Sequence, residues 1–555
     1  MNEVIGIDTL ALYAVGSAAL FVAVKKARAR AQLSFAKHRS LAGHPRMARR
    51  VAALLPSYTY EEDQAFAVDG APPDVVAKRR AAFESLIERC QARYPKTLQA
   101  GAEAAETLSD LQFVSAYRTP FQFRKLAAKG LKVGSFVQST EGVTVTDLDG
   151  NRFYDLTGSY GVNLFGNDFY KDCMDRGADI VRVVGPVLGA YHPVVLDNLQ
   201  RIKTISGMEE VSFHMSGTEA VMQAVRLARY HTGRKKLVRF CGSYHGWWGD
   251  VQPGIGNPMP ATDTLNLTEM GEGTLRVLRS RRDIACVLIN PLQALHPNAP
   301  APSDGALLDS SRKAHFDKAA YTAWLQELRR ICDARCIALI FDEVFMGFRL
   351  AKGGAQEYFG VRADLVTYGK TLGGGLPVGV VCGKRVWMRR FREGSPADIC
   401  FARGTFNAHP YVMAAMNVFL KRLEDEDIAT LYAHVDATWS QRAALMNTRL
   451  QQAGLPVQVA DMSTVWTVLY TQPASFNWLF QHYLRQEGVA LSWVGSARII
   501  WSLNFSDEEF EQVLQCFVRA GLAMQADGWW WTDGLTTNKT IKRRLLREML
   551  AAKFA

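Results

Sequence analysis

The chain has 555 residues, enough for two or more domains around a large core. Its net charge of +11 does not indicate a nucleic-acid-binding face, because most of the excess lies in residues 25–50, with nine Lys or Arg and no acid. Nine cysteines at irregular spacing exclude a disulfide framework, and no Cys/His pair completes a metal site with Cys332 and Cys336. We therefore predict a globular protein of a reducing compartment.

Residues 4–24 are almost entirely apolar, and 21 residues are enough to cross a bilayer core of roughly 30 Å. No basic segment precedes them and no cleavage site follows, so a cleaved signal peptide is not expected. We predict a single-pass transmembrane anchor at residues 1–24, with the rest of the chain cytoplasmic because the basic cluster follows it. A helix packed on the globular part is the alternative.

Residues 25–115 are predicted to be a basic linker and a helical extension. Apolar residues fall on one face of residues 74–93, between Pro72-Pro73 and Pro95, and residues 97–111 form a second predicted helix. The extension could be an added domain, a partner-docking element or an arm across a dimer.

From residue 135 onward, short strand-like runs are joined by Asp149-Gly150, a tight-turn pair. Further along, apolar strands alternate with amphipathic helices, which predicts a mostly parallel α/β sheet. The runs concerned are strands at 236–240, 284–289, 337–341 and 365–368, and helices at 221–230 and 321–332.

Two of these strands end in reactive side chains. Residues 337–341 are followed by Asp342 and Glu343, and residues 365–368 by Gly369-Lys370. Open α/β sheets bind ligands at the carboxyl ends of their strands. A lysine that forms a Schiff base with an aldehyde, and a carboxylate that keeps a ring nitrogen protonated, together suit pyridoxal phosphate. A surface lysine beside a glycine-rich turn is the alternative.

Two further turns could contribute to such a site. Ser216-Gly217-Thr218 begin a predicted helix, whose free N–H groups and positive dipole end suit a phosphate, although ordinary helix capping explains them equally well. Tyr244-His245 lie in a glycine-flanked turn that could place an aromatic ring on a flat cofactor, or could be a plain surface turn.

Five motifs together resemble the class III aminotransferases, and within them the glutamate-1-semialdehyde aminomutases. They occur in the family's order at 216–220, 244–246, 341–344, 353–360 and 369–379, and the resemblance runs from about Thr119 to about Leu522. It implies the α/β fold of type I pyridoxal-phosphate-dependent transferases, with a large, mostly parallel sheet domain and a smaller α+β domain. It also implies pyridoxal 5'-phosphate as cofactor.

The resemblance assigns roles residue by residue. Lys370 would be the catalytic Schiff-base lysine and Asp342 the partner of the ring nitrogen. Thr405 would reach the phosphate of the neighbouring subunit, which implies a homodimer with shared active sites. Asn266 is a weaker match to a cofactor-side asparagine. The full cofactor-binding set is Ser216, Gly217, Thr218, Tyr244, His245, Asp342, Lys370 and Thr405.

Three departures from the aminomutases bear on the substrate. Asn290 replaces an active-site glutamate, Gln122 replaces an arginine with Arg124 two positions later, and residues 404–410, including His409, form a bulkier wall. With Tyr160 of the turn at 158–161, these are the predicted substrate residues. A pocket without a firm carboxylate clamp favours amination of a lipophilic aldehyde or ketone by an amino-acid donor. The aminomutase reaction and a non-catalytic membrane scaffold are the alternatives.

The last residues, 526–555, combine three tryptophans with a basic amphipathic helix at 539–554. This pattern is typical of an interfacial membrane contact, or of a helix docked on the enzyme's own surface. The predicted divisions are an anchor at 1–24, an extension at 25–115, small-domain segments at 116–164 and 426–525, a large cofactor-binding domain at 165–425 and a tail at 526–555.

Overall fold

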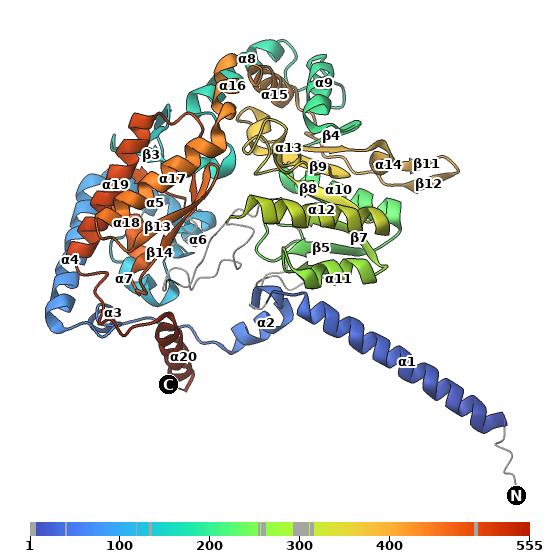
Figure 1. Ribbon diagram of the computed structural model, residues 1–555. Coiled ribbons are helices and arrows are strands. Elements are labelled where there is room, and N and C mark those ends of the chain that lie inside the picture. The colour runs from blue at the N-terminus through green and yellow to red at the C-terminus, as the bar shows by residue number, and fades with distance from the viewer. Residues whose placement is uncertain are drawn as a thin grey trace, which may run out of the picture.

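The largest element of the fold is a twisted seven-stranded sheet (Figure 1). The structure is a computed structural model that describes residues 7–38, 41–117, 119–131, 136–252, 256, 262–291, 310, 316–492 and 498–554. Only β10 runs antiparallel to its neighbours, so the predicted mostly parallel α/β fold is confirmed. In spatial order the strands are β4 (Glu210–His214), β10 (Gly379–Gly383), β9 (Leu365–Gly369), β8 (Ala338–Asp342), β7 (Ile284–Ile289), β5 (Lys236–Phe240) and β6 (Thr264–Leu267).

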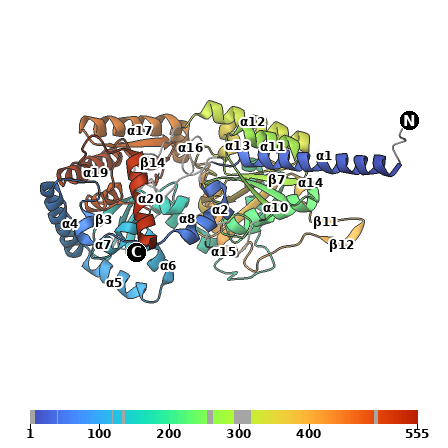
Figure 2. The same ribbon diagram turned by 90° about the horizontal axis from the view of Figure 1, so that it is seen from below.

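The central strands are buried on both faces. Every residue of β7, β8 and β9 is buried, which explains their unbroken apolar runs, since helices cover both sides of a parallel sheet. The residues of β7 belong to two different cores: Leu288 packs in the core that contains α10 (Gly217–Thr232), and Val287 in the core that contains α12 (Lys318–Arg335). Figure 2 accordingly places α12 and α11 (Glu272–Ser280) on one side of β7 and α10 on the other.

Two smaller sheets form the rest of the enzyme body. One is antiparallel and joins β13 (Val457–Met462), β14 (Val465–Tyr470) and β16 (Arg498–Ile500). The other joins β1 (Ser139–Glu141), β2 (Thr144–Thr146), β3 (Arg152–Asp155) and β15 (Val489–Ala490), so residues near 150 pair with residues near 490. The exact domain boundaries stay predictions.

The remaining helices of this body connect and cover the sheets. They are α8 (Asn167–Val181), α9 (Val194–Ser206), α13 (Gly354–Phe359), α14 (Arg385–Met388), α15 (Pro410–Arg422), α16 (Glu426–Ala433), α17 (Val435–Gln452), α18 (Phe480–Gln486) and α19 (Asp507–Ala526), with a β11 (Phe391–Arg392) and β12 (Ser395–Ile399) hairpin.

The first helix, α1 (Ile7–Phe35), projects away from the body in Figure 1. Among the residues that the structure describes, no helix is long and apolar enough to cross a membrane. This finding contradicts the predicted single-pass anchor at residues 1–24 and the predicted membrane localisation.

The structure has helices where the sequence predicts them before residue 115, with one difference. The helix expected at 74–93 is α4 (Pro73–Arg93), whereas the one expected at 97–111 is divided into α5 (Pro95–Ala105) and α6 (Ser109–Tyr117). Prolines at the first turns of α4 and α5 account for these starts. The shorter helices of the extension are α2 (Pro45–Leu54) and α3 (Glu62–Ala65), and α7 (Arg124–Ala127) follows after it.

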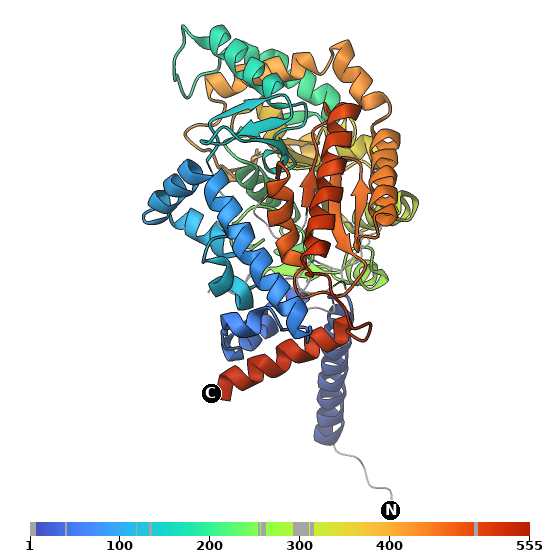
Figure 3. The same ribbon diagram turned by 90° about the vertical axis from the view of Figure 1, so that its left-hand side faces the viewer.

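The C-terminal helix α20 (Asn538–Phe554) docks on this extension, and Figure 3 shows it crossing beside the first helices. Its Ile541 is 1% exposed, and its Glu548 accepts hydrogen bonds of 2.7 Å from the hydroxyls of both Tyr58 and Tyr60. These contacts favour the docked alternative over a membrane contact for the tail.

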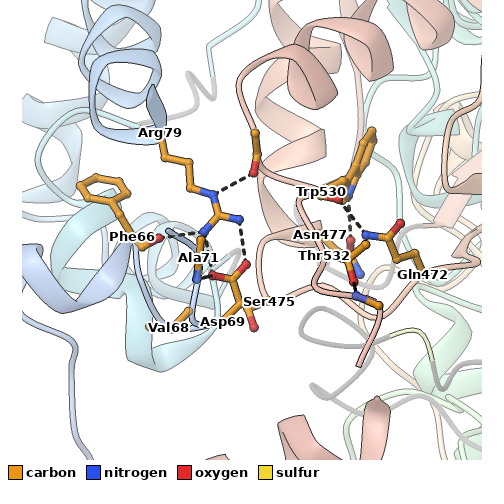
Figure 4. Close-up of polar contacts among 12 residues, drawn as sticks. Phe66, Val68, Asp69, Ala71, Arg79, Gln472, Ser475, Asn477, Trp530 and Thr532 are labelled. Carbon is orange, nitrogen blue, oxygen red and sulfur yellow. Dashed lines mark hydrogen bonds and ion pairs between the residues drawn. The ribbon is translucent and has the colours of Figure 1, made fainter. Parts of the chain in front are cut away.

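A buried arginine joins the extension to the chain after α19 (Figure 4). The Arg79 side chain is fully buried; it donates to both Asp69 carboxylate oxygens, to the Phe66 carbonyl and to the Gly528 carbonyl, at 2.7–2.8 Å. Its guanidinium also lies 4.6 Å from the centre of the Phe476 ring. One side chain therefore fixes α4 against segments about 400 residues away.

Replacing Arg79 with Leu leaves the Asp69 carboxylate buried without its partner, which costs about 3–5 kcal/mol of unfolding free energy. Arg80→Leu is the matched control, because Arg80 pairs with Glu62 and Asp63 at the surface and its loss costs below about 1 kcal/mol. Urea denaturation followed by tryptophan fluorescence measures both. Equal losses in the two variants would contradict the role assigned to Arg79.

Candidate active site

A cavity of about 810 Å³ opens where β8 and β9 end. Its wall brings together most of the residues predicted from the sequence, although they are spread over more than 200 positions. Those that line it are Tyr160, Ser216, Gly217, Thr218, Tyr244, His245, Asn290, Asp342 and Lys370.

Asp342 is a buried carboxylate at the last position of β8, 3% exposed. His245 Nδ1 donates to its Oδ2 at 2.7 Å, and its Oδ1 accepts from the Val344 amide and the Thr367 hydroxyl. Burial lowers the pKa of His245, so the ring is neutral and carries its proton on Nδ1. Three donors from different segments thus hold the Asp342 carboxylate in one orientation at the cavity.

Glu343, although adjacent in sequence, does not serve the cavity. Its carboxyl group is 1% exposed and accepts hydrogen bonds from the amides of Ala355 and Gln356, so it supports the start of α13. Burial raises its pKa to about 8. Of the two acids at the end of β8, only Asp342 lines the active-site cavity.

Lys370 follows β9 directly and begins a 3₁₀ turn, η5 (Lys370–Gly373). Its φ of +47° is unusual for a residue with a side chain, a conformation that folded proteins tolerate where function requires it. Burial lowers the pKa of its amine. The negative charge of Asp342 opposes this shift, and the positive charge of Arg498 adds to it. A larger neutral fraction makes this amine a better nucleophile.

The start of α10 supplies unpaired backbone donors. Ser216 is the N-cap, and its hydroxyl accepts from the Glu219 amide at 3.3 Å, so it does cap the helix. The first N–H groups of any helix have no partner within it, and they lie at the positive end of its dipole. A Cβ on Gly217 would come within 2.6 Å of Val344, so only glycine fits between the helix start and the end of β8.

The Tyr244 turn lies against the same helix start. Gly246 has a φ of +87°, and a Cβ at this position would clash with Thr218. Tyr244 is 62% exposed and lines the cavity, so its ring face is accessible from it. An aromatic ring, a carboxylate, a buried amine and a helix N-terminus thus surround one space.

This set fits pyridoxal 5'-phosphate. Gly217 and Thr218 at the start of α10 would hold its phosphate, Tyr244 its ring face, Asp342 its ring nitrogen and Lys370 its aldehyde carbon. The glycines at 217 and 246 keep the backbone close enough to leave room for the group.

Other predicted residues lie outside the lining of this cavity. Gln122 is 1% exposed and its carbonyl accepts from the Tyr60 amide, whereas His409 caps α15. Arg124 and Thr405 are also absent from the lining. Asn266, on β6, lines a different cavity. Their functional roles stay predictions.

Several lining residues were missed from the sequence: Val162, Met215, Phe345, Ser492, Arg498 and Ile500. Arg498 begins β16, a strand of the small antiparallel sheet, and reaches the cavity only through tertiary packing. The sequence signal for Arg498 was weak: it is a single cation at the start of a short apolar run. Phe345 directly follows the motif at 341–344, two residues after Glu343.

Lys370→Ala removes the amine that would link to the cofactor, so borohydride treatment of the chain with pyridoxal 5'-phosphate should no longer attach the cofactor covalently. Peptide mass spectrometry should find the label on the peptide containing Lys370 in the unchanged protein. The matched control is Lys384→Ala, since Lys384 pairs with Asp364 away from the cavity. Undiminished labelling of Lys370→Ala would exclude the assignment.

The family model "Aminotransferase class-III" matches residues 126–250 and 317–520. A glutamate-1-semialdehyde 2,1-aminomutase of Alkaliphilus oremlandii (strain OhILAs) is 30% identical over 405 residues, covering 68% of this chain and 89% of that protein. One of Nitratidesulfovibrio vulgaris (strain DP4) is 33% identical over 338 residues, covering 60% and 77%.

A solved structure described as a transaminase with PLP bound superposes with a TM-score of 0.62 at 26% identity, covering 78% of this chain and 99% of that one. The solved glutamate-1-semialdehyde aminomutase of Pseudomonas aeruginosa PAO1 has a TM-score of 0.63 at 19% identity, which supports the fold alone. Since the family model covers more than half of the chain, this protein belongs to the class III aminotransferases, which are pyridoxal 5'-phosphate-dependent enzymes.

Proposed function

We propose that the enzyme transfers an amino group from an amino-acid donor to a lipophilic aldehyde or ketone in a biosynthetic pathway. The observation that carries this proposal is the apolar portion of the active-site wall. It extends beyond the residues assigned to the cofactor and consists of Val162, Met215, Phe345, Leu376 and Ile500. Apolar surface of this kind stabilises a hydrocarbon chain through burial.

Asn290 supports the same substrate class. It lines the cavity and is 6% exposed, and it replaces the glutamate expected from the aminomutase motif. An amide carries no charge, so this part of the wall repels neither an apolar chain nor a carbonyl oxygen. Burying an unpaired neutral polar group costs roughly 2–7 kcal/mol, and burying a charged substrate group beside Asn290 without a partner would cost more.

Arg498 provides a place for the donor's carboxylate. It lines the cavity, its positive charge depresses the pKa of Lys370, and its guanidinium lies 5.9 Å from the centre of the Phe345 ring. A guanidinium can hold a carboxylate through two parallel hydrogen bonds. A donor bound there would have its amine near the Lys370 amine.

The residues divide the chemistry between them. Bound pyridoxal 5'-phosphate supplies an electron sink for the substrate carbon. Lys370 would move a proton to and from that carbon, and Asp342 would keep its negative charge beside the ring nitrogen. The His245 hydrogen bond would keep that carboxylate oriented throughout. Transfer in two halves predicts ping-pong kinetics.

The aminomutase reaction remains the second candidate, because the match to an aminomutase covers 89% of that relative's length. In that reaction the amino group moves within one molecule and no external donor is consumed.

A half-reaction experiment separates the two candidates. We expect an amino-acid donor to convert the bound cofactor to pyridoxamine phosphate, and a long-chain aldehyde or ketone to reverse the change, both followed by absorbance. We expect the pyridoxamine form to yield little 5-aminolevulinate from glutamate-1-semialdehyde. Rapid turnover of that compound without an external donor would overturn the lipophilic-carbonyl proposal.

Arg498→Gln should raise the KM for the amino-acid donor about ten- to hundredfold, the value of a charge-assisted hydrogen bond of about 1.5–3 kcal/mol. The KM for an uncharged ketone should change little. Steady-state kinetics with each substrate varied in turn measures this difference. Arg385→Gln is the control, because Arg385 is exposed and outside the cavity. An equal rise in both KM values would contradict the assignment.

We also propose that the enzyme acts as a homodimer with shared active sites. Thr405 supports this arrangement, since it is exposed and does not line the cavity of its own chain. A role at the phosphate, as the family motif implies, would then be exercised in the neighbouring subunit.

A further inference from the structure

A second cavity, of about 560 Å³, lies between the end of α1, the start of α2 and the edge strand β6. Figure 2 shows the end of α1 beside α11. The next helix in the chain, α2, lies below the large sheet in Figure 1. The family model begins only at residue 126, so α1 and α2 lie outside the matched region. This basic cavity is therefore separate from the aminotransferase site.

Five cationic side chains line the basic cavity: Arg30, Lys37, Arg46, Arg49 and Arg50. Within the described part of the chain, none of the five forms an ion pair with a carboxylate. The two acids that flank β6 in sequence are already engaged, Asp263 by Lys236 at 2.8 Å and Glu269 by the Tyr321 hydroxyl at 2.6 Å. The positive charge of the cavity is thus not neutralised by these acids.

Two of the five cations, Lys37 and Arg49, are also partly buried, whereas Arg30, Arg46 and Arg50 are exposed. Burial lowers the pKa of Lys37, and the charge of Arg46 lowers it further. The pKa of His38 is lowered by burial and by His44. Arg49 Nε is buried and has no hydrogen-bond acceptor among the described residues. A donor left without an acceptor costs free energy that a bound anion would restore.

The segment that carries the basic residues packs against the large sheet and α11, and does not extend freely into solvent. The Ala36 carbonyl accepts a 2.8 Å hydrogen bond from the Thr268 amide, and Ala36 itself is 2% exposed. A Cβ on Gly273 of α11 would come within 3.2 Å of Ala36, so the two backbones are in close contact. The basic segment is therefore fixed against the sheet.

We propose that the basic cavity binds a small anion carrying two or more phosphate groups. Four arginines offer forked donors that match phosphate oxygens, and five cations require several negative charges to balance them. The volume lies within the range of sites for small molecules, which is roughly 300–1,000 Å³, and far exceeds the needs of a single inorganic ion. This inference does not depend on the proposed substrate.

Isothermal titration of the full-length holoenzyme with pyrophosphate tests the proposal. We expect saturable binding that weakens at least about tenfold in the triple variant Arg46→Gln, Arg49→Gln and Arg50→Gln. The matched control is Lys25→Gln, Lys26→Gln and Arg28→Gln, which removes the same charge from α1 outside the cavity. Equal weakening in both variants, or no binding by the unchanged protein, would overturn the proposal.

Thermal unfolding gives a second readout that does not rely on the variant keeping native stability. Removing like charges should leave the ligand-free melting temperature unchanged or higher. Pyrophosphate should raise it in the unchanged and control proteins but not in the triple variant, because only a ligand of the folded state stabilises it. Citrate binding as tight as pyrophosphate would refute the preference for phosphate.

The phosphate groups could belong to a soluble ligand or to a lipid head group. Competition between pyrophosphate and phosphatidylcholine vesicles with or without phosphatidic acid distinguishes them. Displacement of pyrophosphate only by the acidic vesicles supports a head group, and lack of displacement supports a soluble ligand. Displacement by vesicles of both compositions alike would show that net negative charge is not required, and would contradict the proposal.

Discussion

The hydrogen bond of 2.7 Å between His245 Nδ1 and Asp342 Oδ2 is the constraint on which the active site depends. A carboxylate at the end of a fully buried strand needs donors, because burying it alone costs a large free energy. These donors come from the Tyr244 turn, from β9 and from the chain after β8. Holding Asp342 in place thus fixes the relative positions of three segments that meet at the cavity.

The sequence allowed one part of the cavity wall to be predicted, because Asp342 and Lys370 follow directly from strand ends. Continuous apolar runs at β8 and β9 predict buried parallel strands, and neighbouring strand ends place Asp342 and Lys370 together. The part of the wall that the small antiparallel sheet contributes was missed. Arg498 and Ile500 enter from the small sheet, and no local pattern indicates which face of a short strand will meet a distant cavity.

The positions of the two ends of the chain were also not predictable from local sequence. Apolar residues near the amino terminus and tryptophans near the carboxyl terminus each fitted a membrane contact, since composition does not say what covers a surface. The tail is instead held by Tyr58 and Tyr60 at Glu548, almost 500 positions away, and by Trp529 donating to the Tyr483 hydroxyl. Partners so remote in sequence are found only once the fold is known.

The basic cavity differs from the rest of the molecule in that its cations lack ion-pair partners among the described residues, whereas the buried arginines elsewhere have polar partners. Arg79 is neutralised by Asp69, and the fully buried Arg349 donates to the Thr464 hydroxyl and the Trp501 carbonyl. Burial still lowers the pKa of Arg349 to about 10, so even a well-bonded buried guanidinium carries a cost. The active-site cavity presents Arg498 beside one lysine, which suits a singly charged carboxylate. The five cations of the smaller cavity have no ion-pair partners in the described residues, and two of them, Lys37 and Arg49, are partly buried, which favours a ligand of higher negative charge there.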